Sequence, residues 1–211
     1  MKLMIAVPML DTVLADFHIS CLGLRHDGNV QWVHTRSSLV YDSRNSLARQ
    51  AILKKFDRIL WLDSDMKFDS DLIYRLSADL DDGRDMVSGL YVTRKPPYKP
   101  VIFDKCGYEQ MEGKDEVRPV AHTYYDYPKD SVFEVDACGF GGVMMKVSLL
   151  EEVEKNYGRP FSPIMGFGED MSFCLRVKDL GKKIWCDSRV KMGHIGYMSY
   201  TEEYYEQTKG H

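Results

Sequence analysis

The sequence predicts an α/β fold in which a mostly parallel central sheet is flanked by helices and joined to a smaller antiparallel part. Up to residue 92, short apolar runs alternate with segments whose apolar positions recur at helical spacing, which favours a parallel sheet with crossover helices. The run at 59–62 is apolar throughout, as in a strand buried on both faces, and it ends in Asp63-Ser64-Asp65. With 44% hydrophobic residues, the 211-residue chain can form one folded domain.

The first half of the chain reads as alternating strands and helices. Apolar positions three and four residues apart mark the helices, and Asp27-Gly28-Asn29 and Gly83 mark breaks. The expected elements, in chain order, are a strand at 3–7, a turn at 8–11, a helix from residue 12, a strand at 30–34, a loop at 36–41, a helix capped by Asp42 or Ser43, a strand at 59–62, a helix at 70–80 and a strand at 86–92.

The second half is less regular. The prolines of the segment 94–100 remove backbone donors and fix φ, so we expect a basic, semi-rigid loop there. The polar segment 104–130 has weak periodicity and reads as an insertion of short strands and loops. The remaining expected elements are strands at 132–135 and 143–145, a helix capped by Ser148 and ending near Gly158, a loop at 160–168, a helix opened by Glu169-Asp170 and closed by Gly181, and a strand at 183–186.

Composition narrows the function classes. The net charge is −4, with 28 basic and 32 acidic residues, so no global field draws the chain to nucleic acid or anionic lipid. The five cysteines show no C-x-x-C spacing, which favours reduced thiols over a disulfide framework or a zinc site. The apolar run at 3–10 contains Pro8 and lacks a cleavage site, and no stretch approaches the ~20 apolar residues of a membrane span. We therefore expect a soluble, cytoplasmic protein.

The Asp63-Ser64-Asp65 end of the central strand is the strongest candidate site. In an extended backbone residues i and i+2 point the same way, so Asp63 and Asp65 can aim at one point. A divalent cation removes the repulsion between them, and hard oxygen ligands suit Mg²⁺ or Mn²⁺. Open α/β sheets bind ligands beyond the carboxyl ends of their strands, where Asp11 would also lie. The same residues also fit a turn in which Asp65 or Asp69 caps the following helix.

Other segments carry groups suited to a cleft. Arg44 falls in the expected first turn of a helix, where the macrodipole does not favour a cation, so it either meets an anion or base in the cleft or lies exposed. The glycines at 139–142 allow close backbone approach or positive φ. Glu169-Asp170 supplies either a favourable helix start or a base facing the cleft. His194, between two glycines, is expected to be poorly packed and free to bind a ligand, or inert.

Together these segments resemble GT-A-fold glycosyltransferases, most closely the family 2-like group with its small bacterial and phage members. The segments that carry the resemblance are, in order, P-M-L-D, R-N-S-L-A, D-S-D, A-C-G-F-G-G, G-E-D-M-S-F-C-L-R, G-K-K-I-W-C-D and G-H-I-G. The resemblance covers nearly the whole chain and is weakest at 104–130. It implies one Rossmann-like GT-A domain with a nucleotide-binding half at 1–100, an acceptor and catalytic half at 101–196 and a tail at 197–211.

The resemblance also implies an activity and residue roles. The expected activity is metal-dependent transfer of a sugar from a nucleoside-diphosphate sugar, with UDP as the expected nucleotide, to an acceptor hydroxyl with inversion. Asp170 would be the catalytic base, with Glu169 beside it. The residues implied to hold Mn²⁺ or Mg²⁺ are Asp63, Asp65 and His194, and those implied to bind the donor are Pro8, Asp11, Arg44, Asp63, Ser64, Gly141 and Gly142.

Two other classes remain open from the sequence. A sugar nucleotidyltransferase also uses an α/β sheet and metal-binding carboxylates, but it would carry a glycine-rich basic loop after the first strand, which 8–12 lacks. A non-catalytic nucleotide- or carbohydrate-binding module could lack half of the machinery. The acceptor is open among a glycan, a lipid-linked sugar, a protein and a modified base in phage DNA, for which the basic loop at 94–99 would contact phosphate. The oligomeric state is open as well.

Overall fold

The computed structural model of the chain describes residues 1–197, 201, 202, 204, 206 and 209, so most of the segment 197–211 lies outside the described residues. Its centre is a seven-stranded sheet in the order β2-β1-β3-β10-β5-β11-β8. The pairings leave β1, β2, β3, β5 and β11 running in one direction and β8 and β10 in the other. The predicted α/β class with a mostly parallel sheet is confirmed. The sheet strands are β1 Lys2–Met9, β2 Asn29–Arg36, β3 Arg58–Leu62, β5 Met86–Leu90, β8 Val132–Val135, β10 Gly142–Lys146 and β11 Ile184–Lys191.

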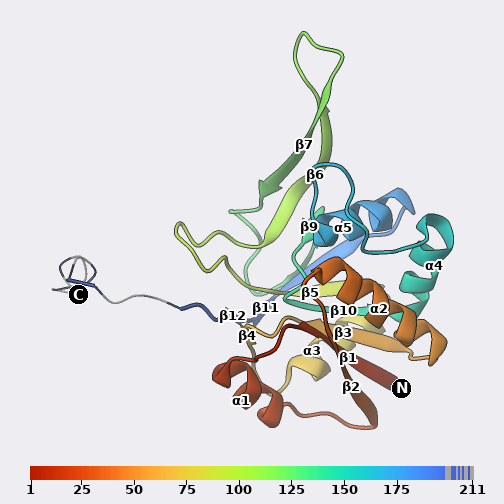
Figure 1. Cartoon of the computed structure of the whole chain (residues 1–211), viewed down its shortest axis with the longest axis vertical. Coiled ribbons are helices and arrows are strands. Elements are labelled where there is room, and N and C mark those ends of the chain that lie inside the picture. The colour runs from red at the N-terminus through yellow and green to blue at the C-terminus, as the bar shows by residue number, and fades with distance from the viewer. Residues whose placement is uncertain (198–200, 203, 205, 207–208, 210–211) are drawn as a thin grey trace.

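Five helices in the described part of the chain cover the two faces of the sheet (Figure 1). On β1, Leu3, Ile5 and Val7 belong to the core on the side of α1 and α3, whereas Met4 and Ala6 belong to the core on the side of α2, α4 and α5. This alternation follows from the two-residue period of a strand and explains why the run is apolar at every position. The helices are α1 Ala15–Gly23, α2 Val40–Leu53, α3 Leu72–Asp81, α4 Val147–Tyr157 and α5 Glu169–Asp179.

Two small antiparallel sheets complete the fold. A two-residue strand, β4 (Met66–Lys67), pairs with β12 (Gly193–His194) directly after the Asp63-Ser64-Asp65 segment. The second small sheet has the order β7-β6-β9, and its strands are β6 Ile102–Gln110, β7 Val117–Thr123 and β9 Ala137–Cys138. No helix of the described residues is both long and apolar enough to cross a membrane.

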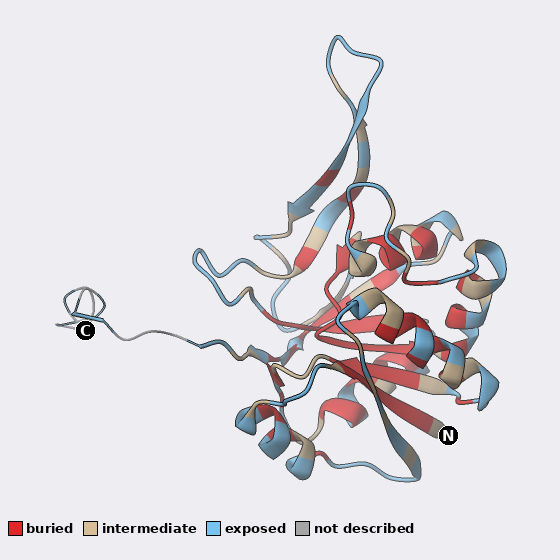
Figure 2. Cartoon of the chain, viewed as in Figure 1, coloured by how far each residue is buried: buried red, intermediate tan, exposed pale blue. Residues whose placement is uncertain are grey.

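The hairpin formed by β6 and β7 corrects the prediction of short strands and loops at 104–130. It projects from the body of the molecule, and most of its surface is exposed (Figures 1 and 2). In β6 only Ile102 and Cys106 are buried. Because most of the hairpin has no core to face, its sequence has no apolar alternation from which a long strand could be predicted.

Four helix starts differ from the prediction. The helices α1 and α3 begin at Ala15 and Leu72 rather than at residues 12 and 70. The helix α2 begins at Val40 rather than after a cap at Asp42 or Ser43, because the hydroxyl of Ser37 accepts the Leu39 N–H and the Leu39 carbonyl accepts the first helical bonds. Arg44 therefore lies beyond the first turn. The helix α4 begins at Val147 rather than after a cap at Ser148, since β10 runs directly into it.

Candidate active site

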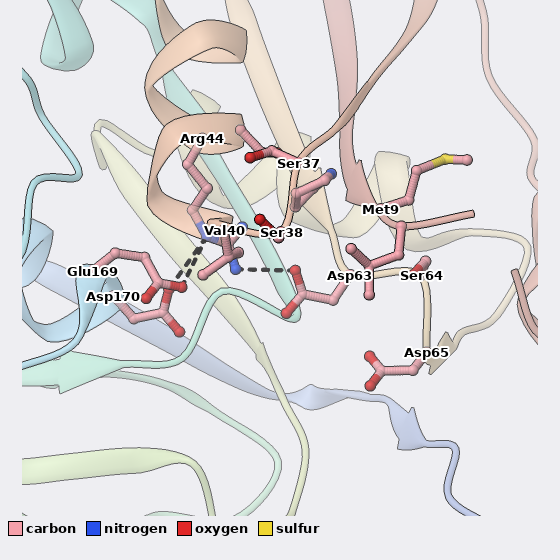
Figure 3. A pocket seen from close by; sticks show the side chains of 13 residues that line it. Met9, Ser37, Ser38, Val40, Arg44, Asp63, Ser64, Asp65, Glu169 and Asp170 are labelled. Carbon is pink, nitrogen blue, oxygen red and sulfur yellow. Dashed lines mark hydrogen bonds and ion pairs between the residues drawn. The ribbon is translucent and has the colours of Figure 1, made fainter. Parts of the chain in front are cut away.

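The carboxyl ends of β1 and β3, with the loop after β2 and the starts of α2 and α5, enclose an open cavity of about 300 Å³ (Figure 3). This is the position at which open α/β sheets bind their ligands. Carboxylates lie on two sides of the cavity, one group from the end of β3 and one from the start of α5. The lining residues are Pro8, Met9, Leu10, Ser37, Ser38, Val40, Ser43, Arg44, Asp63, Ser64, Asp65, Glu169 and Asp170.

Arg44 joins the two groups of carboxylates. The residue is only 1% exposed, and its Nη2 lies 3.0 Å from Oδ1 of Asp63. Its Nε lies 3.4 Å from both Oε1 of Glu169 and Oδ1 of Asp170 (Figure 3). Burial alone would lower the pKa of Arg44, but Asp63, Asp170 and Glu169 raise it above its ordinary value. The guanidinium, carried by α2, is therefore a fixed cation that connects the carboxyl end of β3 with the start of α5.

The Arg44 side chain is almost completely shielded from solvent, with 2% of it exposed. Its guanidinium carbon lies 5.8 Å from the ring centre of Trp61 and 5.3 Å from that of Phe140, both fully buried. Cation–π contacts of this kind are strongest where water is excluded. The exposed arginine that the sequence left open is therefore excluded, and the anions that Arg44 meets here are carboxylates of the protein itself.

Asp170 has the environment of a titratable base. Its side chain is 26% exposed, and Oδ2 accepts a hydrogen bond of 3.1 Å from the Phe140 N–H. Burial raises the pKa of Asp170 to about 7, with Glu169 and Asp63 adding to the rise and Arg44 and the Phe140 N–H opposing it. A carboxylate with a pKa near neutrality can both take and release a proton at working pH.

Asp65 lies on the outer side of the cavity with two cationic or polar partners. Its Oδ2 is 2.8 Å from Nη1 of Arg94 and 3.4 Å from Nε2 of His194. Burial raises the pKa of Asp65, but the hydrogen bond to His194 and the charges of His194 and Arg94 lower it further, so the pKa is below its ordinary value. Asp65 does not cap the following helix, whose first residue is Leu72 and whose N-cap is Asp71.

His194 is better packed than the flanking glycines suggested. Its ring makes an edge contact with Tyr91 at 5.5 Å, and its Nδ1 lies 3.0 Å from the Val92 carbonyl oxygen. A carbonyl oxygen can only accept, so Nδ1 carries a proton and Nε2 is left facing Asp65. Metal-binding histidines are oriented in this way by a backbone carbonyl. The β4–β12 pairing places His194 opposite Met66, next to Asp65 in the chain.

The implied metal can be tested against these donors. Carboxylate oxygens with one imidazole nitrogen form a set that suits Mn²⁺ or Mg²⁺, and the orientation of Nε2 of His194 toward Asp65 fits such a site. Asp63 also lines the cavity, with a 31% exposed side chain, while its Oδ1 is engaged by Arg44. Burial raises the pKa of Asp63 even though Arg44 opposes this. Over the described residues, no three Asp, Glu, His or Cys side chains already form a group that could hold a metal ion.

The remaining predicted residues do not all reach the cavity. Pro8 and Ser64 line it, whereas Asp11 is exposed and is not among the lining residues. Gly141 and Gly142 are buried behind it. A Cβ at Gly142 would lie 2.2 Å from Sδ of Met192, and the Gly141 carbonyl accepts the Asp63 N–H at 3.3 Å. These glycines make room for packing and support the Asp63 backbone.

Several lining and supporting residues were not found from the sequence. Ser37 and Ser38 line the cavity from the loop after β2. Tyr91, 7% exposed, accepts the Gly141 N–H at its hydroxyl and packs on His194. A Cβ at Gly139 would lie 2.2 Å from the Tyr91 hydroxyl, so the glycine run is shaped around a tyrosine. The sequence contains a tyrosine near the end of a predicted buried strand and, separately, a glycine run. Their contact is seen only in the structure.

Comparison with known proteins identifies the fold. No protein-family model and no curated protein sequence matches the chain. The solved structure of A197 from STIV aligns over 96% of this chain and 100% of its own, with a TM-score of 0.61 and 16% identity. GalNAc-T7, crystallised with UDP, GalNAc and Mn²⁺, aligns over 94% of this chain with a TM-score of 0.60 and 11% identity. TarS 1–349 from S. aureus aligns over 92% with a TM-score of 0.57 and 13% identity.

The shared part is a GT-A-like fold, and GalNAc-T7 and TarS are glycosyltransferases. The chain spans 44% of the GalNAc-T7 chain and 60% of the TarS chain, so it corresponds to only part of each. At these identities the likeness is one of fold, and the predicted GT-A-type architecture is confirmed.

Proposed function

We propose that the protein is a metal-dependent glycosyltransferase that moves a sugar from a nucleoside-diphosphate sugar, with UDP as the expected nucleotide, to an acceptor hydroxyl with inversion. One observation carries the proposal: the Asp63-Ser64-Asp65 end of β3 and the Glu169-Asp170 start of α5 meet across one cavity and share Arg44. The cavity thus combines groups suited to a donor phosphate and a group suited to an acceptor proton. The ligands named with GalNAc-T7, which shares the fold, support the choice of UDP and Mn²⁺.

The donor side would consist mainly of residues from the first half of the chain. Asp63, Asp65 and, from the second half, His194 would hold Mn²⁺ or Mg²⁺, which supplies Lewis-acid stabilisation of the charge on the departing diphosphate. Pro8, Ser64 and the Ser37-Ser38 loop would contact the nucleotide, because they line the same cavity. Asp11, Gly141 and Gly142 would act only indirectly. Arg44 would hold Asp63 in place.

The acceptor side would be provided by α5. An acceptor hydroxyl must lose its proton as it attacks the anomeric carbon, and Asp170 can take that proton while it is ionised. The Phe140 N–H donates to Oδ2 of Asp170 and holds the carboxylate before the acceptor arrives, while Oδ1 has no hydrogen-bond partner and lies 3.4 Å from Nε of Arg44. Attack from the side opposite the diphosphate inverts the anomeric centre. Glu169, which also contacts the Arg44 guanidinium, would set the orientation of Arg44.

The test is a thermal-shift series with UDP, GDP, CMP and dTDP, each with and without Mn²⁺. A ligand that binds only the folded state raises the melting temperature, by an amount equivalent to about 2.7 kcal/mol at a hundred times its dissociation constant. We expect a metal-dependent response to UDP. The matched control is Asp69→Ala, an exposed carboxylate outside the cavity lining, which should respond as the wild type does. If no nucleotide raises the melting temperature in Mn²⁺, the donor site is wrong.

A second assay separates a transferase from the two other classes. Incubation with UDP-sugars and Mn²⁺ should release UDP slowly through transfer to water, and faster with an acceptor. A binding module would shift in melting temperature without releasing UDP. A sugar nucleotidyltransferase would instead form the UDP-sugar from UTP and a sugar phosphate and release pyrophosphate.

A further inference from the structure

Arg94 occupies the outer carboxylate of the candidate donor site. Its Nη1 lies 2.8 Å from Oδ2 of Asp65, the same oxygen that faces Nε2 of His194 at 3.4 Å. In this state the negative charge of Asp65 is already matched by a cation of the protein. The lining carboxylates Asp63 and Asp65 therefore each have an arginine partner, and the two arginines differ in burial.

The backbone that carries Arg94 is fixed, whereas its side chain is not enclosed. The Thr93 N–H donates to the Lys99 carbonyl at 2.9 Å, and the Lys99 N–H donates to the Thr93 hydroxyl at 3.0 Å, so the proline-containing segment 93–100 closes on itself. The Arg94 side chain is 48% exposed. The Arg94 guanidinium can therefore change partners while the backbone of the segment 93–100 stays in place.

The same segment positions the imidazole beside Asp65. The Val92 carbonyl, two residues before Arg94, orients His194 through Nδ1. On the other side, the stem of Arg94 packs against the backbone at Gly196, where a Cβ would lie 3.3 Å from Cδ of Arg94. Residues 92–94 thus position both Arg94 and His194 beside Oδ2 of Asp65. Any cation that binds this oxygen would contact both side chains.

A divalent cation and the Arg94 guanidinium cannot share Asp65 Oδ2, because their like charges repel at such distances. We propose that Arg94 is an exchangeable cation: it neutralises Asp65 while the donor site is empty, leaves that oxygen when a divalent metal binds, and then pairs with the phosphates of the nucleotide. The inference rests on the proposed function: the competition rests on its metal site, and the pairing with phosphate rests on its nucleotide donor. A half-exposed arginine is suited to phosphate because it presents several donors in a planar fork.

The alternative is that Arg94 and Asp65 form a surface ion pair with no role in ligand binding. Such pairs contribute little to stability, so substitution of Arg94 should leave the melting temperature of the free protein nearly unchanged under either interpretation. The two interpretations differ in ligand affinity. The exchange predicts opposite effects on metal and nucleotide, which a general loss of structure cannot produce.

The experiment measures Mn²⁺ binding to the full chain without nucleotide, by electron paramagnetic resonance of free Mn²⁺, for the wild type and Arg94→Gln. We expect the variant to bind Mn²⁺ about three- to tenfold more tightly, the range for removal of one competing, partly exposed ion pair. In saturating Mn²⁺, calorimetry should show UDP binding weakened about three- to tenfold. Lys95→Gln, an exposed lysine of the same segment, is the control and should change neither affinity.

Each outcome decides between the interpretations. Mn²⁺ affinity that is equal or weaker in Arg94→Gln overturns the exchange, as does the absence of Mn²⁺ binding in both proteins. Tighter Mn²⁺ binding with unchanged UDP affinity overturns the transfer of Arg94 to phosphate. Tighter Mn²⁺ binding with no UDP binding in either protein contradicts the proposed function and leaves the competition between Arg94 and metal supported.

Discussion

The two aspartates of the Asp63-Ser64-Asp65 segment lie two residues apart and have opposite surroundings. Asp63 is bound to Arg44, which is 1% exposed and also holds Glu169 and Asp170. Asp65 is bound to Arg94, whose side chain is 48% exposed. We call the first set of four residues the inner cluster, and we call Asp65, Arg94 and His194 the outer cluster. One strand end thus supplies a carboxylate to each.

The difference shows how burial divides the work within one cavity. A buried cation among three carboxylates cannot leave without exposing uncompensated charge, so the inner cluster is fixed and suits orientation of a base. An exposed ion pair is weak and exchanges readily with solvent and ions, so the outer cluster suits binding and release of a charged ligand. The comparison predicts that substitutions of Arg44, Glu169 and Asp170 change turnover or folding, and that substitutions in the outer cluster change affinity.

The largest expected effect is on turnover in Asp170→Asn. An amide keeps the size of the side chain but cannot take the acceptor proton, so the rate of transfer should fall by roughly 10²- to 10⁴-fold. The dissociation constant for UDP with Mn²⁺ should stay nearly unchanged, the pattern of a group that acts in the transition state. Steady-state kinetics and calorimetry on the same preparation measure both quantities.

Glu169→Gln is the matched control, because it removes a neighbouring charge from the same arginine. We expect a smaller loss of turnover from the altered orientation of Arg44. If Asp170→Asn is active and Glu169→Gln is inactive, the base is Glu169. If both turn over normally, the Glu169-Asp170 pair is only a helix start.

The next largest effect concerns the free energy of unfolding of Arg44→Met. Loss of the buried cation leaves Asp63, Glu169 and Asp170 without their shared partner, which should cost about 3 to 5 kcal/mol. Urea denaturation at pH 8 measures the change. Arg49→Met, which removes an exposed arginine of the same helix from its pair with Glu154, should cost less than about 1 kcal/mol. Equal costs for the two variants would mean that the buried ion pairs of Arg44 contribute no more to stability than a surface ion pair.

The pH dependence of turnover should follow Asp170. Because its pKa is raised to about 7 and the base must be ionised, kcat/KM should fall about tenfold for each pH unit below 7 and level off above it. The contribution of Asp170 to the free energy of unfolding changes with pH in the opposite direction. The folded pKa exceeds the unfolded value of about 3.9, so the stabilising contribution of protonated Asp170 is complete below about pH 4 and is lost as the pH rises through 7.

Asp170→Asn distinguishes this group from other carboxylates in the same pH range, since it should remove the part of the stability profile that falls between pH 4 and 7. Asp79, with a pKa raised to about 6 by burial and by Asp187, lies outside the cavity lining and should keep its own contribution in the variant. A rate profile in Asp170→Asn with the same acid limb as the wild type would contradict the assignment.

The smallest expected effect is that of His194→Ala in the outer cluster. Loss of one imidazole from a site that keeps its carboxylates should weaken Mn²⁺ binding about tenfold and leave the melting temperature of the free protein nearly unchanged. Titration of Mn²⁺ by electron paramagnetic resonance measures the loss. His122→Ala, on the projecting hairpin, is the control. Unchanged Mn²⁺ affinity in His194→Ala would remove His194 from the metal site.

The parts of the site that follow from local patterns were predictable from the sequence. The apolar run before Asp63 predicted a buried strand, and the alternating elements placed its end at the carboxyl edge of a sheet, where the cavity lies. The geometry of the inner cluster was not predictable in the same way. Arg44 reaches Glu169 across 125 residues of sequence, and no local period encodes that contact.

The outer cluster shows the same limit. Flanking glycines indicated a loosely packed His194, but its ring is held by Tyr91 and the Val92 carbonyl from a distant strand end. Tertiary contacts also moved the start of α2, because the Ser37 hydroxyl supplied a partner for the Leu39 N–H that the sequence did not single out. Sequence patterns specified the strands and the edge of the sheet, whereas the partners of each side chain depended on packing.

The most direct test of the division between the clusters is calorimetry of UDP binding in saturating Mn²⁺ for three proteins: the wild type, Asp65→Ala and Asp170→Asn. The account predicts that Asp170→Asn binds UDP within about twofold of the wild type and that Asp65→Ala shows no metal-dependent binding, since its remaining donors leave the diphosphate charge largely uncompensated. UDP binding by Asp65→Ala with wild-type affinity would contradict the account, because the outer carboxylate would then have no part in holding the donor.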